Sequence, residues 1–193
     1  IPWNKEPTAQ IICDLNYPSS EPSKIAPRQV LKNIIRQLSD ENLRAVVAPE
    51  LEFYLCEQNL DPDLPLKTPI GKSGRRETGS RVFGIDAVNE FDKLTDDIYD
   101  YCELMNIGVD TLVHESGPSQ IEINLNHGDP LALADQAFMF KRAVRQVALK
   151  HNIHATFMAK PYQGQPGSSM HIHQNLVAAK TGENLFSDKE GNN

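Results

Sequence analysis

Two glutamates separated by a single residue lie within an apolar segment, in the run Pro49-Glu50-Leu51-Glu52-Phe53. Because side chains two positions apart in a strand lie on the same face, Glu50 and Glu52 would hold their carboxylates close together. Buried like charges repel each other, and a cation between them relieves the repulsion. Mg²⁺ and Mn²⁺ prefer oxygen ligands of this kind. The pair indicates a site for such a cation, although a solvated edge strand with two surface glutamates explains it equally well.

A second pair of glutamates flanks the turn Ser116-Gly117-Pro118-Ser119. Glu115 ends one strand-like run and Glu122 lies in the next, so a hairpin would return the second carboxylate close to the first. Two surface glutamates on an exposed hairpin are the alternative interpretation.

Two histidines, His171 and His173, also lie two positions apart in a strand-like run. Both rings would point to one face, and neutral imidazole binds borderline metals, although many such pairs are structural or exposed. Four carboxylates and a histidine pair could together line one face of a single sheet. This combination suits Mg²⁺ or Mn²⁺ bound around phosphate oxygens, and it does not indicate a thiolate-rich or closed tetrahedral zinc site.

Two other motifs do not support a site of their own. Gly71-Lys72-Ser73 is similar to the end of a phosphate-binding P-loop, but Leu66 stands where that motif requires glycine. The glycine- and serine-rich segment 164–169 could approach a ligand through its backbone, but a turn between two strands explains it as well.

The segments that must position these residues alternate between helical and extended patterns. Apolar residues recur at helical spacing in the ranges 27–39, 89–105 and 130–150. Strand-like runs cover residues 9–15, 45–55, 110–115, 120–126, 153–158 and 170–176. Strand pairs punctuated by helices predict an α+β fold with an antiparallel sheet. Residues 57–80 carry prolines and glycines among charges, which predicts a long loop that is either functional or disordered.

The composition is that of an ordinary globular protein, with 39% hydrophobic and 23% charged residues over 193 positions. A formal net charge of −7 argues against nonspecific nucleic-acid binding, which needs a basic surface. No run approaches the ~18 apolar residues of a membrane span. Three widely spaced cysteines without a CxxC pair favour reduced thiols and a cytoplasmic location. The chain begins without methionine and ends in a polar run, so we expect a fragment.

Four segments, in order and at matching spacing, resemble the glutamine synthetase family. They are Pro49–Phe53, His114–Glu122, Ala155–Pro161 and Gly167–His173, and the resemblance runs from about residue 8 to the end of the chain. It implies that residues 21–193 are the first part of a glutamine-synthetase-type catalytic domain, with a curved antiparallel sheet, flanking helices and a missing C-terminal third. Residues 1–20 would be the end of a small β-grasp domain, which in this family completes a neighbouring subunit's active site.

The resemblance also implies two metal sites. Glu50 and His171 would bind the cation near the ATP phosphates, together with a glutamate beyond residue 193. Glu52, Glu115 and Glu122 would bind the cation that positions glutamate and its activated form.

Other residues are assigned to the substrates by the same resemblance. His173 and Asn175 would contact the nucleotide phosphates, although the family more often has serine at the second position. The backbone of Gly167 would contact glutamate. Glu115 would also lie near the amine pocket and help to bind or deprotonate the amine, which makes it the candidate catalytic residue.

The implied activity is that of an ATP- and Mg²⁺- or Mn²⁺-dependent ligase. Glutamate is converted to γ-glutamyl phosphate, and an amine then displaces phosphate. Pro166 replaces an asparagine that contacts glutamate in bacterial glutamine synthetases, and Val82 falls where those enzymes carry a tyrosine of the ammonium pocket. The segments 86–92, 140–142 and 171–174 look closer to the γ-glutamylpolyamine (putrescine) synthetase branch. We therefore favour a polyamine or alkylamine acceptor over ammonia.

The resemblance further implies a ring-shaped homo-oligomer, a dodecamer in the full-length family member, with no nucleic-acid or membrane partner. The family's substrate-binding arginines, flap glutamate and last metal ligand lie in its C-terminal third, so the chain alone should be inactive. Two alternatives remain open. One is a non-catalytic structural relative of the same fold, and the other is a metal-dependent hydrolase that uses the same carboxylates.

Overall fold

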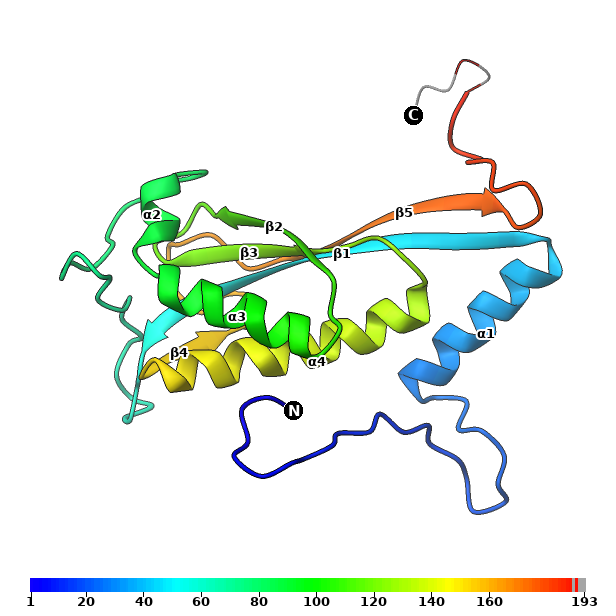
Figure 1. The fold of residues 1–193 in the computed structure, drawn as a ribbon, viewed down its shortest axis with the longest axis horizontal. Coiled ribbons are helices and arrows are strands. Elements are labelled where there is room, and N and C mark those ends of the chain that lie inside the picture. Colours follow the sequence, from blue (N-terminus) through cyan, green and yellow to red (C-terminus); the bar gives the residue numbers. More distant parts are fainter. Residues whose placement is uncertain (189, 191–193) are drawn as a thin grey trace.

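One five-stranded antiparallel sheet with helices packed against one face makes up the core of the molecule, in a computed structural model that describes residues 1–188 and 190 (Figure 1). In chain order, the helices and strands of these residues are α1 (Pro27–Asp40), β1 (Leu43–Glu57), α2 (Ile85–Asn89), α3 (Asp92–Leu104), β2 (Val109–His114), β3 (Gln120–Leu125), α4 (Pro130–Lys150), β4 (Ile153–Thr156) and β5 (Met170–Ala178). The predicted α+β fold with an antiparallel sheet is confirmed.

Strand β1 organises the sheet because it pairs with three other strands, all antiparallel. Its N-terminal part, Leu43–Leu51, pairs with β5, and the two strands extend together beyond α3 and α4, toward α1 (Figure 1). Its C-terminal part pairs with β3 on one side and with β4 on the other, and β2 adds to the outer edge of β3. A single long strand therefore connects segments that are far apart in the sequence.

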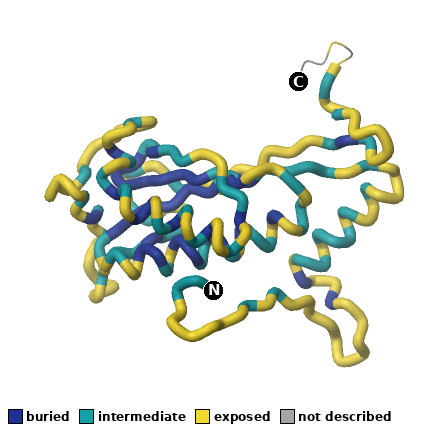
Figure 2. The backbone as a smooth tube through the Cα atoms, in the orientation of Figure 1, coloured by how far each residue is buried: buried dark blue, intermediate teal, exposed yellow. Residues whose placement is uncertain are grey.

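The hydrophobic core lies between the sheet and helices α3 and α4, where Figure 2 shows the buried backbone. Leu51, Phe53 and Leu55 alternate along β1 and point into this core, as do Ile121 and Ile123 of β3. Because side chains alternate across a strand, Glu50, Glu52, Tyr54 and the even-numbered residues of β3 point to the opposite face. We call that opposite face the polar face.

Helix α4 has the bounds that the sequence predicts, and its first turn explains why. Asp129 accepts hydrogen bonds from the backbone N–H groups of Leu131 and Ala132 at 3.0 and 2.9 Å, and Pro130 occupies the first helical position. A side-chain cap of this kind stabilises a helix by about 1 kcal/mol. The apolar stripe of the helix, with Phe140 and Val144 at its centre, is fully buried.

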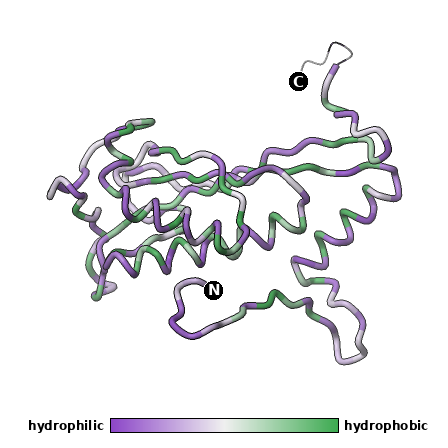
Figure 3. Tube along the Cα trace, viewed as in Figure 1, coloured by the Kyte–Doolittle hydropathy of each residue, from purple (hydrophilic) through white to green (hydrophobic). Residues whose placement is uncertain are grey.

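The predicted strand over residues 9–15 is wrong. The segment is irregular, and Figure 3 shows its apolar stretch between the N-terminus and α1, away from the sheet. Asp14 instead forms ion pairs with Arg28 and Lys32 of α1, and Arg28 also pairs with Asp135 of α4 at 3.0 Å. A strand needs an adjacent strand to satisfy its backbone, and in the described residues this segment lies against helices instead.

The predicted helix over residues 89–105 is two helices, α2 and α3. The helical path breaks at Phe91, whose buried side chain joins the core and whose φ and ψ of −124° and 27° are not helical. Residues 58–84 contain no helix or strand, which agrees with the predicted loop, apart from an isolated bridge between Ile70 and Arg76. No helix in the described part of the chain is long and apolar enough to cross a membrane.

Candidate active site on the polar face of the sheet

Three strands bring acidic and imidazole side chains together on the polar face. The register pairs Glu52 of β1 with Glu122 of β3, and Glu50 of β1 with His171 of β5. Directly opposed residues of an antiparallel pair share a face, with Cβ atoms ~5 Å apart. We call these four residues the carboxylate cluster.

The donor atoms of the cluster have the spacing of ligands around one cation. One ligand atom from each of Glu50, Glu122 and His171 lies within 4.8 Å of the others. His171 Nδ1 lies 3.4 Å from Glu50 Oε2 and 3.9 Å from Glu52 Oε1. Oxygen ligands bind Mg²⁺ at ~2.1 Å, so donors on opposite sides of the ion are separated by ~4 Å. Several carboxylate oxygens with one imidazole fit Mg²⁺ or Mn²⁺.

Burial adds to the electrostatic cost of this arrangement. Glu52 and Glu122 each expose only 8% of their surface. Burial raises the pKa of Glu122, and the negative charges of Glu50, Glu115 and Glu52 raise it further. The same two effects, burial and the charges of Glu52 and Glu115, raise the pKa of Tyr54 to about 12. A dication in the cluster would relieve this repulsion.

Glu115 lies at the end of the polar face, in the turn between β2 and β3. Its backbone N–H donates to the carbonyl of Gln120 at 2.8 Å, and its carboxylate accepts from the backbone N–H of Ser116 at 3.0 Å. Its charge affects the pKa values of both Tyr54 and Glu122, so it acts on the same region as the cluster. The group of donors within 4.8 Å includes neither Glu115 nor Glu52.

The two predicted nucleotide-binding residues continue a row along β5. His173 lies opposite Ala48 and Asn175 opposite Val46, on the same face as His171. His173 Nε2 lies 3.0 Å from Glu50 Oε1, and 68% of its side chain is exposed. The row therefore leads from the cluster along an open surface of the sheet.

Gly167, the predicted glutamate-binding residue, lies in the loop before β5 and is held close to the cluster. A Cβ atom at this position would lie 2.8 Å from the carbonyl oxygen of Ala159, so a larger residue would move the backbone. Its own carbonyl oxygen accepts a hydrogen bond from Gln120 Nε2 at 2.9 Å.

Gln120 also belongs to this site, although no chemical motif in the sequence marks it. It is fully buried, and its Nε2 also donates to Glu52 Oε2 at 2.9 Å, while its Oε1 accepts from the backbone N–H of Gly117 at 2.8 Å. One amide therefore connects a carboxylate of the cluster, the turn that carries Glu115 and the loop of Gly167. The signal was present in the sequence as a polar residue on the same side of its strand as Glu122.

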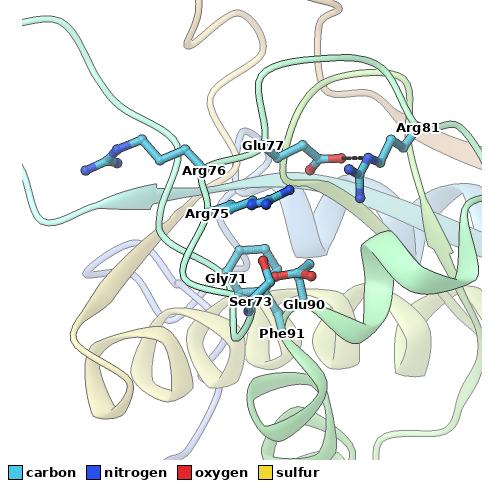
Figure 4. A pocket seen from close by; sticks show the side chains of 8 residues that line it. All are labelled: Gly71, Ser73, Arg75, Arg76, Glu77, Arg81, Glu90 and Phe91. Atoms are coloured by element: carbon cyan, nitrogen blue, oxygen red, sulfur yellow. Dashed lines mark hydrogen bonds and ion pairs between the residues drawn. The ribbon is translucent and has the colours of Figure 1, made fainter.

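A separate cavity of about 370 Å³ lies between the loop that follows β1 and the junction of α2 with α3 (Figure 4). Its lining residues are Gly71, Ser73, Arg75, Arg76, Glu77, Arg81, Glu90 and Phe91. None of the four residues of the carboxylate cluster lines it. The cavity and the candidate site are therefore different places in the fold.

The chain is similar to several known ligases. The glutamine synthetase catalytic domain matches residues 24–193. The gamma-glutamylputrescine synthetase PuuA of Escherichia coli (strain K12) is 43% identical over 172 residues, which are 88% of this chain and 36% of that protein. A glutamine synthetase of Pyrococcus abyssi is 34% identical over 191 residues, which are 99% of this chain and 40% of that protein.

A solved structure, the GmaS/ADP complex, superimposes with a TM-score of 0.77 at 26% identity, covering 93% of this chain and 40% of GmaS. The chain thus spans between 36% and 40% of the length of these relatives. The matched family, the shared fold and the order of the four segments agree with one another. The chain belongs to the glutamine synthetase family.

Proposed function

We propose that this chain carries the metal-binding part of a ligase that uses ATP to join an amine to the side-chain carboxylate of glutamate. The observation that carries this proposal is the carboxylate cluster, in which three carboxylates and an imidazole from three strands lie on one face. The relatives named above are ligases of the same family.

The side chains of the cluster, together with Glu115, have the chemistry that suits Mg²⁺ or Mn²⁺, and we propose two such cations. We assign Glu50 and His171 to one cation, and Glu52, Glu115 and Glu122 to the other. When bound, the cations spread the negative charge that develops on the transferring phosphoryl group. The protein's part is to hold its carboxylates on one side of the sheet, which the register of β1 with β3 and β5 achieves.

We assign His173 and Asn175 to the nucleotide phosphates. Both lie on the exposed side of β5, and His173 lies next to Glu50, so a phosphate bound there would lie close to the first cation site. Hydrogen bonds from such groups to phosphate oxygens orient the nucleotide without reacting with it. The ADP complex of the related GmaS supports a nucleotide substrate.

The glutamate site would lie between the loop of Gly167 and the turn of Glu115, which Gln120 connects. Phosphoryl transfer to the glutamate side chain gives γ-glutamyl phosphate, and the amine nitrogen then attacks its carbonyl carbon and expels phosphate. Glu115 would bind the incoming ammonium group and accept its proton, as a general base at hydrogen-bonding distance does.

We favour a polyamine or alkylamine as the acceptor. Sequence identity is 43% to a gamma-glutamylputrescine synthetase and 34% to a glutamine synthetase. Val82 also lacks the hydroxyl that the resemblance places in an ammonium pocket. Ammonia is the alternative acceptor. A non-catalytic relative is disfavoured, because the buried carboxylates of the cluster are costly to keep without a cation.

The arrangement of the longer protein is part of the same proposal. Residues 1–20 would end a β-grasp domain, residues 21–193 would begin the catalytic domain, and the protein would work in the cytoplasm as a ring-shaped homo-oligomer, with twelve subunits expected from the family. The segments beyond this chain would supply the remaining substrate contacts.

The test is an amine-panel assay on the full-length protein that contains this chain. Putrescine, isopropylamine and ammonia are compared by kcat/KM for amide formation, with ATP, glutamate and Mn²⁺ present. Amide formation with putrescine at the highest kcat/KM supports the proposal, and a preference for ammonia indicates a glutamine synthetase proper. Phosphate release without any amide indicates a hydrolase, and failure of ATP and Mn²⁺ to raise Tm indicates a structural relative.

A further inference from the structure

The long loop between β1 and α2 sends one carboxylate, that of Glu77, into the fold. Only 9% of this side chain is exposed, although its neighbours in the loop are exposed. Thr68 Oγ1 donates to the backbone carbonyl of Glu77 at 2.9 Å, which fixes the loop at this point. A buried carboxylate requires specific partners, because its burial is otherwise unfavourable.

The partners of Glu77 flank the turn that carries Glu115. Its Oε2 accepts a hydrogen bond from the backbone N–H of Ser119 at 2.6 Å and lies 2.9 Å from His114 Nε2. The other ring nitrogen of His114, Nδ1, lies 2.8 Å from the carbonyl oxygen of Glu115. Glu77 therefore contacts the residue before the turn and the last residue of the turn with a single oxygen atom.

The turn needs such support because of its backbone. Ser119 is fully buried and has a φ of 58°, a left-handed conformation that few residues other than glycine adopt. A hydrogen bond from its N–H to an ionised carboxylate is one of the stronger kinds of hydrogen bond in proteins. Gln120 holds the same turn from the opposite side, through the N–H of Gly117.

The remaining oxygen of Glu77, Oε1, faces the cavity of Figure 4 and makes no hydrogen bond within the described part of the chain. Arg81 Nε lies 4.0 Å from it and partly balances its charge. Glu90, a second carboxylate of the same cavity, accepts instead from the backbone N–H of Ser73 at 3.1 Å and has no hydrogen bond to the turn. Two carboxylates of one cavity therefore differ in whether they hold the turn.

We propose that Glu77 is a positioning residue, which holds the turn 115–119 so that Glu115 stays in place beside the carboxylate cluster. This inference rests on the proposed function, in which Glu115 binds a cation and the amine. The long loop, residues 57–80, then has a role in the site. Within this loop, Glu77 is the residue whose side chain accepts a hydrogen bond from the backbone of the turn 115–119.

The experiment measures Mn²⁺ binding by calorimetry to the full-length protein that contains this chain, for the wild type and for E77A, E77Q, E115A and the double variant E77A/E115A. E90A is the matched control. We expect E77A to bind one of two ions on the order of tenfold more weakly, as for other residues that orient a metal ligand. E77Q should lose less of the Mn²⁺ affinity, because its amide oxygen can still accept the hydrogen bond from the backbone N–H of Ser119. E90A should bind as the wild type does.

The double variant separates positioning through Glu115 from a general structural effect. If Glu77 acts through Glu115, E77A/E115A binds Mn²⁺ no more weakly than E115A. The inference is overturned if E77A weakens Mn²⁺ binding by the same factor in the wild type and in E115A. It is also overturned if neither E77A nor E77Q changes Mn²⁺ binding. If E77A does not fold, the same comparison is made with E77Q and E77Q/E115A.

A second measurement keeps the inference separate from the proposed function. If the wild-type full-length protein binds no Mn²⁺, the proposed metal site is wrong, and amide hydrogen exchange over residues 115–120 then decides the role of Glu77. Faster exchange in E77Q but not in E90A supports positioning of the turn. The same exchange in both variants overturns it.

Discussion

Glu52 and Glu122 lie directly opposite each other on β1 and β3, and both carboxylates are buried. Like charges at directly opposed positions destabilise a sheet. Two carboxylates in this position are therefore unfavourable for folding unless something else binds between them or beside them.

The first prediction concerns this pair in the absence and presence of metal. In EDTA, E122Q should raise the free energy of unfolding by up to about 1 kcal/mol, or Tm by about 2–4 °C for a chain of this size, because it removes one of two opposed charges. With Mn²⁺ present, the wild type should gain stability and E122Q should gain much less. Thermal unfolding of both proteins, in EDTA and in Mn²⁺, measures both effects.

The exposed Glu103 of α3 provides the control, and E103Q should change neither result. An E122Q variant that is less stable than the wild type in EDTA would show that the opposed charges are not the dominant interaction at this position.

The second prediction concerns the acceptor amine. V82Y should raise kcat/KM for ammonia on the order of tenfold in the full-length protein, which corresponds to about 1.4 kcal/mol, the net value of one hydrogen bond. Val82 is 42% exposed, so the larger ring can be accommodated. V82F supplies the ring without the hydroxyl and should give no gain. Equal gains in V82Y and V82F would mean that the hydroxyl is not responsible.

The third prediction concerns the turn that carries Glu115. A Cβ atom on Gly117 would lie 1.9 Å from the hydroxyl oxygen of Tyr54 and 2.5 Å from its Cζ, so G117A must displace a buried ring. We expect a loss of about 1–3 kcal/mol, which is typical of overpacking. Urea unfolding measures the change.

Gly79, in the long loop, provides the matched control, because a Cβ atom at this position would have no neighbouring atom within 4 Å. G79A should therefore leave the urea midpoint close to that of the wild type. A G117A variant as stable as G79A would show that Tyr54 moves aside without cost.

The fourth prediction concerns pH. Burial raises the pKa of Asp97, but hydrogen bonds and ion pairs with Lys150 and His151 outweigh this effect and leave the pKa below its ordinary value of 3.8. The charged form is thus favoured in the folded chain. Asp97 should contribute about 1 kcal/mol above pH 4, after allowance for solvent screening, and this contribution should disappear as the pH falls below 3.8.

The measurement compares unfolding free energies of the wild type and D97N between pH 7 and pH 3. The difference should shrink as the solution becomes acidic, and D96N, at the exposed neighbouring position, should show no such trend. A difference that stays constant down to pH 3 would exclude the ionised carboxylate as its source.

Much of the candidate site follows from strand periodicity alone. The spacing of Glu50 and Glu52 placed both on one face, and the alternation in residues 120–125 placed Glu122 on the same side as Gln120. Periodicity does not give register, so the sequence alone did not show that Glu52 lies opposite Glu122 or that Glu50 lies opposite His171. Those pairings depend on contacts between distant segments.

The remaining differences have similar physical reasons. The apolar run over residues 9–15 has the composition of a strand, but no strand of the described chain lies beside it. Glu77 gave no signal, because a single glutamate in a charged loop looks like a surface residue until its contacts with His114 and Ser119 are known. Tertiary contacts, rather than local propensity, determine both cases.

Strand β1 spans both halves of the molecule, since one end pairs with β5 and the other lies in the core. Glu50 and His171 are neighbours only after the chain has closed a loop of well over a hundred residues, and a slip of one residue would turn the proposed ligands of the slipped strand toward the helices. In the proposed site, cation affinity would therefore be a property of the completed fold. Titrating the metal during refolding would report when the last long-range strand pairing forms.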